Sequence, residues 1–133
     1  MGKLSFPKGS TVYLDTQIVI YSVETHSRYW PLLEPLWLES QAGNIQIATS
    51  ELTPMEALVA PIRKQDLVLL NAYDRLLCGT ESLLLPVSRE VLIGAARLRA
   101  NYSSLRGPDA IHLSSAREYG CSAFLKNDVG CVR

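Results

Sequence analysis

Short apolar segments that favour β-strands alternate along this chain with longer segments that favour helices, and this alternation is what most constrains the fold. The strand-like segments are 11–14, 44–49, 82–87 and 122–128, with the sequences TVYL, NIQIAT, SLLLPV and SAFLKND. The intervening segments have helical periodicity and end at glycine or polar residues. Parallel strands need crossover connections, which are usually helices. The sequence therefore predicts an α/β fold with a doubly wound parallel sheet and helices on both of its faces.

The expected helices occupy most of the remaining chain. One helix each is expected over 28–43, 53–65, 66–79, 88–102 and 107–120. Pro31 and Pro35 are expected near the start of the first of these, because an interior proline breaks a helix. Pro54 is expected at the first position of the second helix, and Ser88 is expected to cap the fourth. Segment 16–24 is ambiguous, because its β-branched residues favour a strand whereas the Asp-Thr pair before it suits a helix start.

The size and charge of the chain limit what it can be. Its 133 residues suffice for one domain, and we assign 1–10 as a polar N-terminal tail and 11–133 as that domain. Thirteen basic residues balance thirteen acidic ones, so any polyanion must be bound by a local patch rather than by a broad field. Three cysteines without paired spacing indicate a reducing, cytoplasmic setting. No apolar run reaches the ~20 residues that span a membrane.

Four acidic residues stand at the ends of the predicted elements. Asp15 closes the first strand and Asp128 closes the fourth, whereas Glu56 and Asp109 lie in the first turns of two helices. In parallel sheets, the carboxyl ends of the strands and the starts of the helices that follow them meet at one edge, where ligands bind. The four carboxylates are therefore expected to converge.

Each acid taken alone has an ordinary structural explanation. Asp15 can cap a helix, and Glu56 stands three residues after Thr53, at the spacing of a capping box. Asp109 complements a helix dipole, and Asp128 suits a turn. Taken together, converging carboxylates repel by about 4 kcal/mol for a pair 4 Å apart near a protein surface, unless a cation binds or a proton is shared. Oxygen ligands without histidine or cysteine suit Mg²⁺ or Mn²⁺, and such ions can activate water against a phosphodiester.

Other catalytic signatures are absent from the sequence. It has neither a dinucleotide-binding glycine fingerprint nor a phosphate-binding loop with its lysine. The two histidines and three cysteines lack zinc-binding spacing, and no G-x-S-x-G nucleophile motif occurs. The acidic residues are therefore the best candidates for chemistry.

The segments that carry these acids resemble the signature segments of PIN-domain proteins. They are YLDTQIVIY, TSELTPMEAL, LRGPDAIHLSSA and FLKND, in this order and across nearly all of the chain after the tail. The likeness is greatest to the VapC-type toxins of bacterial toxin–antitoxin pairs. The resemblance implies a PIN-like doubly wound sheet and a Mg²⁺- or Mn²⁺-dependent endoribonuclease with RNA as its substrate. It also implies a homodimer and a cognate VapB-type antitoxin that occludes the site.

The resemblance also places functional residues on this chain. The catalytic and metal-binding acids of the family fall on Asp15, Glu56, Asp109 and Asp128. Nearby side chains are candidates for supporting roles, namely Thr16, Ser50, Asn127 and Arg106. The hydroxyl and amide groups can orient water or a carboxylate, with turn hydrogen bonds as the alternative, and Arg106 can contact an RNA phosphate.

His112 is expected to be a packed, hydrogen-bonded histidine. Trp30 and Trp37 are expected in the core, with a groove for an antitoxin helix as the alternative.

Two features depart from the family pattern. Lys126 stands where the family usually has a hydroxyl residue, and strand alternation puts it on the same face as Asp128. The chain ends at Arg133, before the usual final strand, so an open sheet edge is expected. Both features favour an alternative function, a catalytically weak or inactive PIN-like protein that acts as a binding partner. A phosphoacceptor signalling domain is a third possibility, but the strand-like segment 82–87 supplies no acidic acceptor.

Overall fold

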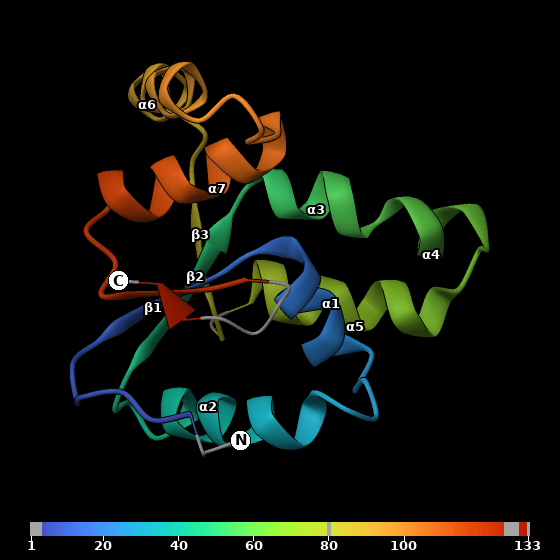
Figure 1. Ribbon diagram of the computed structural model, residues 1–133. Helices are drawn as coiled ribbons and strands as arrows, with labels where there is room; N and C mark the ends of the chain where they lie inside the picture. Colours follow the sequence, from blue (N-terminus) through green and yellow to red (C-terminus); the bar gives the residue numbers. More distant parts are fainter. Residues whose placement is uncertain (1–3, 80, 127–130, 133) are drawn as a thin grey trace.

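The sheet has the predicted parallel arrangement. The structure, a computed structural model, describes residues 4–79 and 81–126 and the backbone of 131–132. The parallel strands are β1 (Thr11–Leu14), β2 (Gln46–Ser50), β3 (Leu83–Leu85) and β4 (Ala123–Leu125). Their order is β3-β2-β1-β4-β5, and β5 (Cys131–Val132) runs antiparallel to β4 (Figure 1). The edge beside β4, which the sequence suggested would be open, is thus paired with a short strand.

Helices cover both faces of the sheet, which confirms the doubly wound α/β prediction. They are α1 (Thr16–Val23), α2 (Trp30–Gln41), α3 (Leu52–Ala57), α4 (Val59–Arg63), α5 (Leu67–Cys78), α6 (Arg89–Asn101) and α7 (Gly107–Glu118). In Figure 1, α6 and α7 lie on one side of the sheet and α1, α2 and α5 on the other. Within the described residues, no helix combines the length and apolar character needed to cross a membrane.

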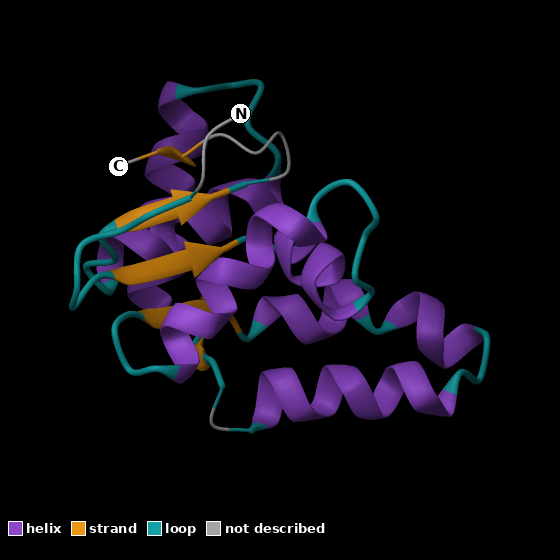
Figure 2. Ribbon diagram, turned by 90° about the horizontal axis from the view of Figure 1, so that it is seen from below, coloured by secondary structure: helices purple, strands orange, loops and turns teal. Residues whose placement is uncertain are grey.

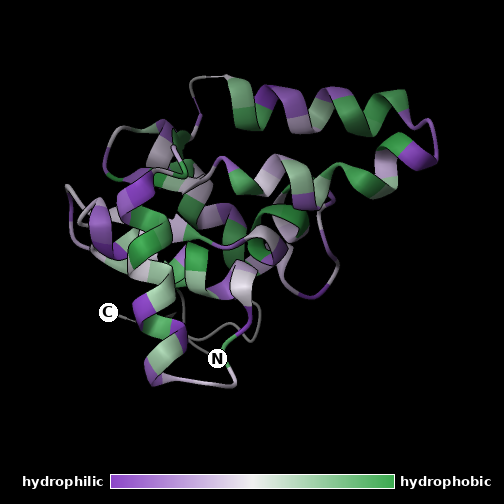
Figure 3. Ribbon diagram, turned by 90° about the horizontal axis from the view of Figure 1, so that it is seen from above, coloured by the Kyte–Doolittle hydropathy of each residue, from purple (hydrophilic) through white to green (hydrophobic). Residues whose placement is uncertain are grey.

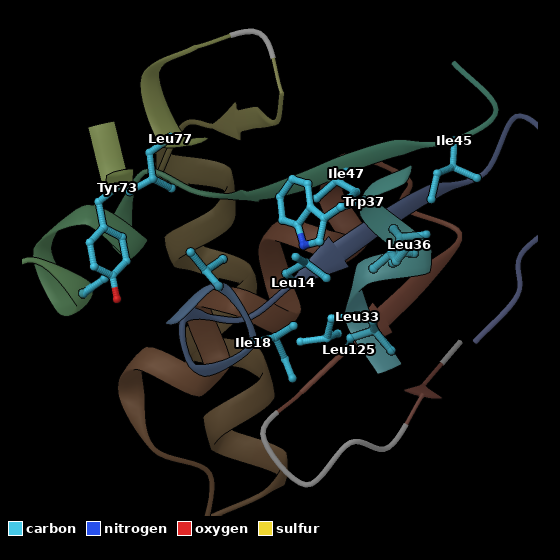
Figure 4. Packing of buried hydrophobic residues seen from close by; sticks show 13 residues of the cluster. Leu14, Ile18, Leu33, Leu36, Trp37, Ile45, Ile47, Tyr73, Leu77 and Leu125 are labelled. Carbon is cyan, nitrogen blue, oxygen red and sulfur yellow. The ribbon is translucent and has the colours of Figure 1, made fainter. Parts of the chain in front are cut away.

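The side chains of β1 divide the core into two parts. Val12 and Leu14 pack in the larger cluster, under α1, α2 and α5, whereas Tyr13 points to the smaller cluster under α7. Alternation of successive side chains across a strand is the reason for this division. Figure 4 shows the larger cluster, in which Trp37 packs beside the central strands. The indole Nε1 of Trp37 donates to Ser22 Oγ at 3.0 Å, which confirms that Trp37 lies in the core. Trp30 is partly buried and packs against the edge of the same cluster.

Segment 16–24, which the sequence left ambiguous, forms helix α1, and the residue before it caps the helix. Asp15 Oδ1 accepts a hydrogen bond from the backbone nitrogen of Ile18 at 3.0 Å and caps α1. A side-chain acceptor at this position satisfies a backbone donor that has no partner within the helix. Ser88 caps α6 in the same way, as predicted, by accepting from the nitrogen of Val91 at 3.2 Å.

Two predictions about prolines were wrong. Segment 53–65 forms two helices, because Pro61 has no N–H to donate to the carbonyl of Ala57 and its ring clashes with that carbonyl. The first helix accordingly ends at Ala57, and it begins at Leu52, so Pro54 is not its first residue. Pro35 lies inside α2 rather than near its start. The helix loses one backbone hydrogen bond there but keeps its buried apolar face.

Helices α3, α4 and α5 form an arm that projects from the sheet (Figure 2). Hydrophobic residues recur along the ribbon of this arm (Figure 3). Those with exposed side chains are Met55, Val59, Ile62, Leu67 and Val68. The most exposed is Val68, at 82% of its maximal area. Apolar surface gathered in this way is typical of a site that a partner covers.

Close packing of α6 against α7 depends on Gly94. A Cβ atom at this position would overlap Ser114 Oγ, which donates to the carbonyl of Val91 at 2.7 Å. We expect Gly94→Ala to lower the free energy of unfolding by about 1–2 kcal/mol. Overpacking destabilises the variant, and the better helix propensity of alanine offsets part of that loss. Denaturant unfolding measures this. In a Ser114→Ala background the obstructing oxygen is gone, so the same change should be neutral or stabilising. An equal loss in both backgrounds would contradict this explanation.

Candidate active site

Three of the four predicted acids line one cleft at the carboxyl edge of the sheet. Its volume is about 280 Å³, and its lining is Asp15, Thr16, Gln17, Ile20, Glu56, Arg106, Asp109 and His112. Helices α1 and α3 begin directly after the central strands β1 and β2, and α7 supplies the third side (Figure 1). Three larger hollows of about 370, 380 and 420 Å³ have at most one acidic side chain in their linings. The smaller cleft is therefore the one equipped for chemistry.

Asp15 is both a helix cap and a residue of the cleft. Its Oδ1 accepts from the nitrogen of Ile18, and its own backbone nitrogen donates to the carbonyl of Leu125 at 3.1 Å. The carboxylate thus lies between β1 and α1, at the positive end of the helix dipole, where a negative charge is tolerated. The capping explanation and the functional one are both compatible with this position.

Glu56 is held by two neighbours at a single oxygen. Its Oε1 accepts from Thr16 Oγ1 at 2.5 Å and lies 3.0 Å from His112 Nε2. The Glu56 side chain is 26% exposed, whereas that of His112 is 3% exposed. The carboxylate therefore reaches the cleft while the half-buried Thr16 and the buried His112 hold one of its oxygens.

The capping box that would have explained Glu56 does not form. The residue before α3 is Glu51, which makes no side-chain cap, and Thr53 lies within the helix. The prediction that Glu56 lies in the first turn was wrong, because α3 begins at Leu52 and ends at Ala57, one residue after Glu56. The single hydroxyl proton of Thr49 goes to the carbonyl of Leu14 at 2.7 Å, so the Thr53 hydroxyl donates to Thr49 Oγ1 at 2.8 Å. These bonds tie the start of α3 to the end of β1, and Glu56 of α3 lines the same cleft as Asp15.

The start of α7 brings a cation and an acid to the same cleft. Asp109 lies in the first turn of α7, and Arg106 is the residue before the helix. Both are exposed and both line the cleft. The arginines of α6 lie elsewhere: Arg97 lines a groove between α6 and α7, and Arg99 Nε donates to the carbonyl of Leu105 at 3.3 Å.

The remaining predicted residues are not part of the described cleft. Asp128 and Asn127 lie outside the described residues, so their positions and the predicted relation of Lys126 to Asp128 stay predictions. Lys126 itself follows β4 and is half-buried. Ser50 is fully buried, and its Oγ accepts from the nitrogen of Leu52 at 2.9 Å, which is the turn hydrogen bond that was its alternative role.

His112 is the cleft residue whose role the sequence did not indicate. It is buried and hydrogen-bonded, as expected, but its partners are functional candidates rather than ordinary core groups. Its Nε2 lies 3.1 Å from Thr16 Oγ1, and its Nδ1 lies 2.7 Å from the hydroxyl oxygen of Tyr13. The available signal was its spacing: three residues after Asp109 on a helix, it shares the face of Asp109.

Tyr13 is held firmly beneath the cleft. It is fully buried, and its ring stacks on that of Phe124 with centroids 5.2 Å apart. The Tyr13 ring and the His112 imidazole form a T-shaped pair with centroids 5.8 Å apart. Burial is the main cause that raises the pKa of the Tyr13 phenol well above its usual value. The phenol therefore keeps its proton and can donate it in a hydrogen bond.

The donor set suits a hard divalent cation. Asp15, Glu56 and Asp109 supply carboxylate oxygens from three different elements to one cleft, and Mg²⁺ and Mn²⁺ prefer such ligands. In residues 4–79 and 81–126, no three histidine, cysteine or acidic side chains are already arranged to hold a metal ion. The fit therefore rests on the chemistry of the donors and on their common cleft.

Comparisons with known proteins agree with this fold. The family model described as PIN domain matches residues 12–131. VapC20 of Mycobacterium tuberculosis, described as a toxin that cleaves the sarcin-ricin loop, has a TM-score of 0.71 and 14% identity, with 88% of this chain and 89% of that chain covered. A toxin–antitoxin complex from Klebsiella pneumoniae has a TM-score of 0.62 and 22% identity, covering 86% and 83%.

A third similar structure is VapBC2 from Rickettsia felis, bound to a DNA fragment from its promoter. It has a TM-score of 0.63 and 17% identity, covering 84% of this chain and 83% of that one. At these identities the likeness concerns the fold alone. No curated protein has a significantly similar sequence.

Proposed function

Because this chain belongs to the PIN domain family, we propose that it is a metal-dependent endoribonuclease, the VapC-type toxin of a cytoplasmic toxin–antitoxin pair. The observation that carries this proposal is the gathering of three carboxylates at one cleft. Asp15 caps α1, Glu56 lies near the end of the short helix α3, and Asp109 lies in the first turn of α7, so the three come from distant parts of the sequence. The acidic cleft and the similarity in fold to toxin structures support the same function independently.

The three carboxylates are the proposed holders of the principal Mg²⁺ or Mn²⁺ ion. Asp128 remains the candidate for a second ion. When bound, the metal makes a water molecule more acidic and polarises a phosphoryl oxygen of the substrate. The expected reaction is hydrolysis: the water oxygen bonds to phosphorus, the bond to the 3′ oxygen breaks, and the products carry a 5′-phosphate and a 3′-hydroxyl.

The other residues of the cleft have proposed roles in holding the acids and the RNA. Thr16 and His112 hold Glu56 Oε1 in place. Arg106 is exposed at the cleft and can pair with an RNA phosphate. Because the chain has no net charge, such local attraction is what brings a polyanion to an acidic cleft.

Dependence on metal is the direct test of this function. In Mn²⁺, the purified protein should cut single-stranded RNA to products with 5′-phosphates. Excess EDTA should stop the reaction, and added Mn²⁺ should restore it. Gel analysis of end-labelled RNA measures both. Cleavage at the same rate in EDTA would contradict the proposal.

We also propose an antitoxin and a second copy of the chain as partners. The similar structures from Klebsiella pneumoniae and Rickettsia felis are described as a toxin–antitoxin complex and as VapBC2. The exposed apolar side chains of the α3–α5 arm are a surface that such a partner can cover, as 71% of Leu67 and 82% of Val68 are exposed. We assign this arm to the antitoxin.

Co-expression with the product of the neighbouring gene should yield a stable complex. Val68→Asp should weaken this complex, because it puts a charge into an apolar contact. Leu92→Asp is the matched control, because Leu92 is 48% exposed on α6, away from the arm. Size-exclusion chromatography with light scattering at micromolar concentration measures the complex and the state of the chain alone. Elution of the chain without its partner would argue against the proposed complex. Equal weakening by the two variants would argue against the α3–α5 arm as the surface that binds the antitoxin.

A further inference from the structure

A hydrogen-bonded chain runs from the core of the sheet to the cleft. It begins at the Tyr13 hydroxyl, passes through both nitrogens of His112 and ends at Glu56 Oε1, with distances of 2.7 and 3.0 Å. These residues come from β1, α7 and α3. No local sequence pattern requires a histidine to bridge a buried phenol and a carboxylate of the cleft.

The hydrogen positions in this chain follow from the chemistry of its ends. An ionised carboxylate only accepts hydrogen bonds, so the proton between His112 and Glu56 lies on Nε2. A neutral imidazole that donates from Nε2 has its acceptor at Nδ1, where the Tyr13 hydroxyl lies. The phenol O–H, 2.7 Å from Nδ1, is the matching donor. Each donor in the chain therefore has an acceptor.

The chain acts on one oxygen of Glu56. Thr16 and His112 both reach Oε1, which leaves Oε2 outside this network. Tyr13 is immobilised by its burial and by stacking on Phe124, and it fixes the imidazole in turn. A carboxylate anchored in this way has fewer rotamers to lose when it binds a cation.

We propose that Tyr13 and His112 are positioning residues that orient the Glu56 carboxylate for the divalent ion. This inference rests on the proposed function, because it takes Glu56 as a metal ligand. His112 itself is not a metal ligand in this arrangement, since both of its nitrogens are already engaged. Outer partners of this kind typically contribute about 10–100-fold to metal affinity.

Manganese binding to the protein without RNA tests the inference. His112→Leu keeps an apolar side chain in the buried site but removes both nitrogens, and it should weaken binding about tenfold or more. Tyr13→Phe keeps the ring stack and removes only the hydroxyl, and it should weaken binding several-fold. His112→Gln places an amide donor near the position of Nε2 and should recover part of the loss. The electron paramagnetic resonance signal of free Mn²⁺ gives the isotherms.

Tyr73→Phe is the matched control for the loss of a buried phenol. Tyr73 is fully buried, but its hydroxyl donates to Glu24 Oε2 at 2.7 Å, and neither residue lines the cleft. The Tyr73→Phe variant should bind Mn²⁺ with the affinity of the wild type. Equal affinity in the wild type and His112→Leu would overturn the inference, as would equal weakening by the two tyrosine variants.

A spectroscopic measurement separates positioning from simple packing. In the wild type, ¹⁵N spectra of the His112 side chain should show a proton on Nε2 and none on Nδ1. In Tyr13→Phe, the Nδ1 shift should move because its hydrogen-bond donor is gone. A proton on Nδ1 of the neutral imidazole would overturn the inference.

The outcomes also distinguish this inference from the proposed function. If the wild type binds Mn²⁺ with the expected order of variants but cuts no RNA, the function fails and the positioning role stands. If the wild type cuts RNA and His112→Leu binds Mn²⁺ equally well, the positioning role fails and the function stands. A wild type that binds no Mn²⁺ overturns both.

Discussion

RNA cleavage should fall by about 100- to 1,000-fold or more when Asp109 is replaced by asparagine, which corresponds to about 3–4 kcal/mol of lost transition-state stabilisation. Asp109 is exposed in the first turn of α7 and lines the cleft. Asparagine has the same shape, so the fold should persist, but it lacks the charge that a hard cation requires. Initial cleavage rates in saturating Mn²⁺, with thermal unfolding of the same samples, measure the two effects.

Glu90→Gln is the matched control for Asp109→Asn. Glu90 is also an exposed acid in the first turn of a helix, α6, but it does not line the cleft. Both variants lose a favourable interaction with a helix dipole, worth about 0.3–1 kcal/mol of stability. Only Asp109→Asn should lose activity. If it cuts RNA at the wild-type rate, Asp109 is not part of the active site.

Manganese should stabilise the wild type strongly and Asp15→Asn weakly. At a free Mn²⁺ concentration of 100 times Kd, ligand linkage adds about 2.7 kcal/mol to the free energy of unfolding, a rise in Tm of roughly 10 °C for a chain of this size. Asparagine retains the side-chain oxygen with which Asp15 accepts from Ile18, so α1 should remain capped. The substitution therefore removes the charge and spares the local structure. Removal of the metal with EDTA should bring the two proteins to similar Tm values.

Asp66→Asn makes the comparison specific to the cleft. Asp66 caps α5 as Asp15 caps α1, by accepting from the nitrogen of Leu69 at 3.1 Å, but it lies outside the cleft. It should retain the full manganese shift. If Asp15→Asn also retained the full shift, Asp15 would be excluded as a ligand.

Local sequence predicted those parts of the fold that depend on neighbouring residues. The alternating pattern of strands and helices predicted the parallel sheet. Ser88 predicted the start of α6, because a capping side chain acts within one turn. The break between α3 and α4 has an equally local cause in Pro61, although the sequence was first interpreted as one helix. The family resemblance added the fold and the positions of the acids. For Asp15 and Asp109 the topology explains why they share a cleft, because strand ends and helix starts meet at one edge of a parallel sheet. Glu56 lies near the end of α3 instead, and tertiary contacts place it there.

The sequence by itself thus determined the order of the elements and the presence of acids at their ends. The tertiary structure alone decided which groups hold those acids. The spacing of Thr53 and Glu56 allowed a capping box as one explanation of Glu56. In the structure Thr53 bonds to Thr49, and Glu56 meets Thr16 and His112, which are 40 and 56 residues distant. Tyr13 and His112 are 99 residues apart and become partners only where α7 packs against β1. Hydrogen-bond partners across elements depend on packing distance and side-chain direction in three dimensions, which helical or strand periodicity does not specify.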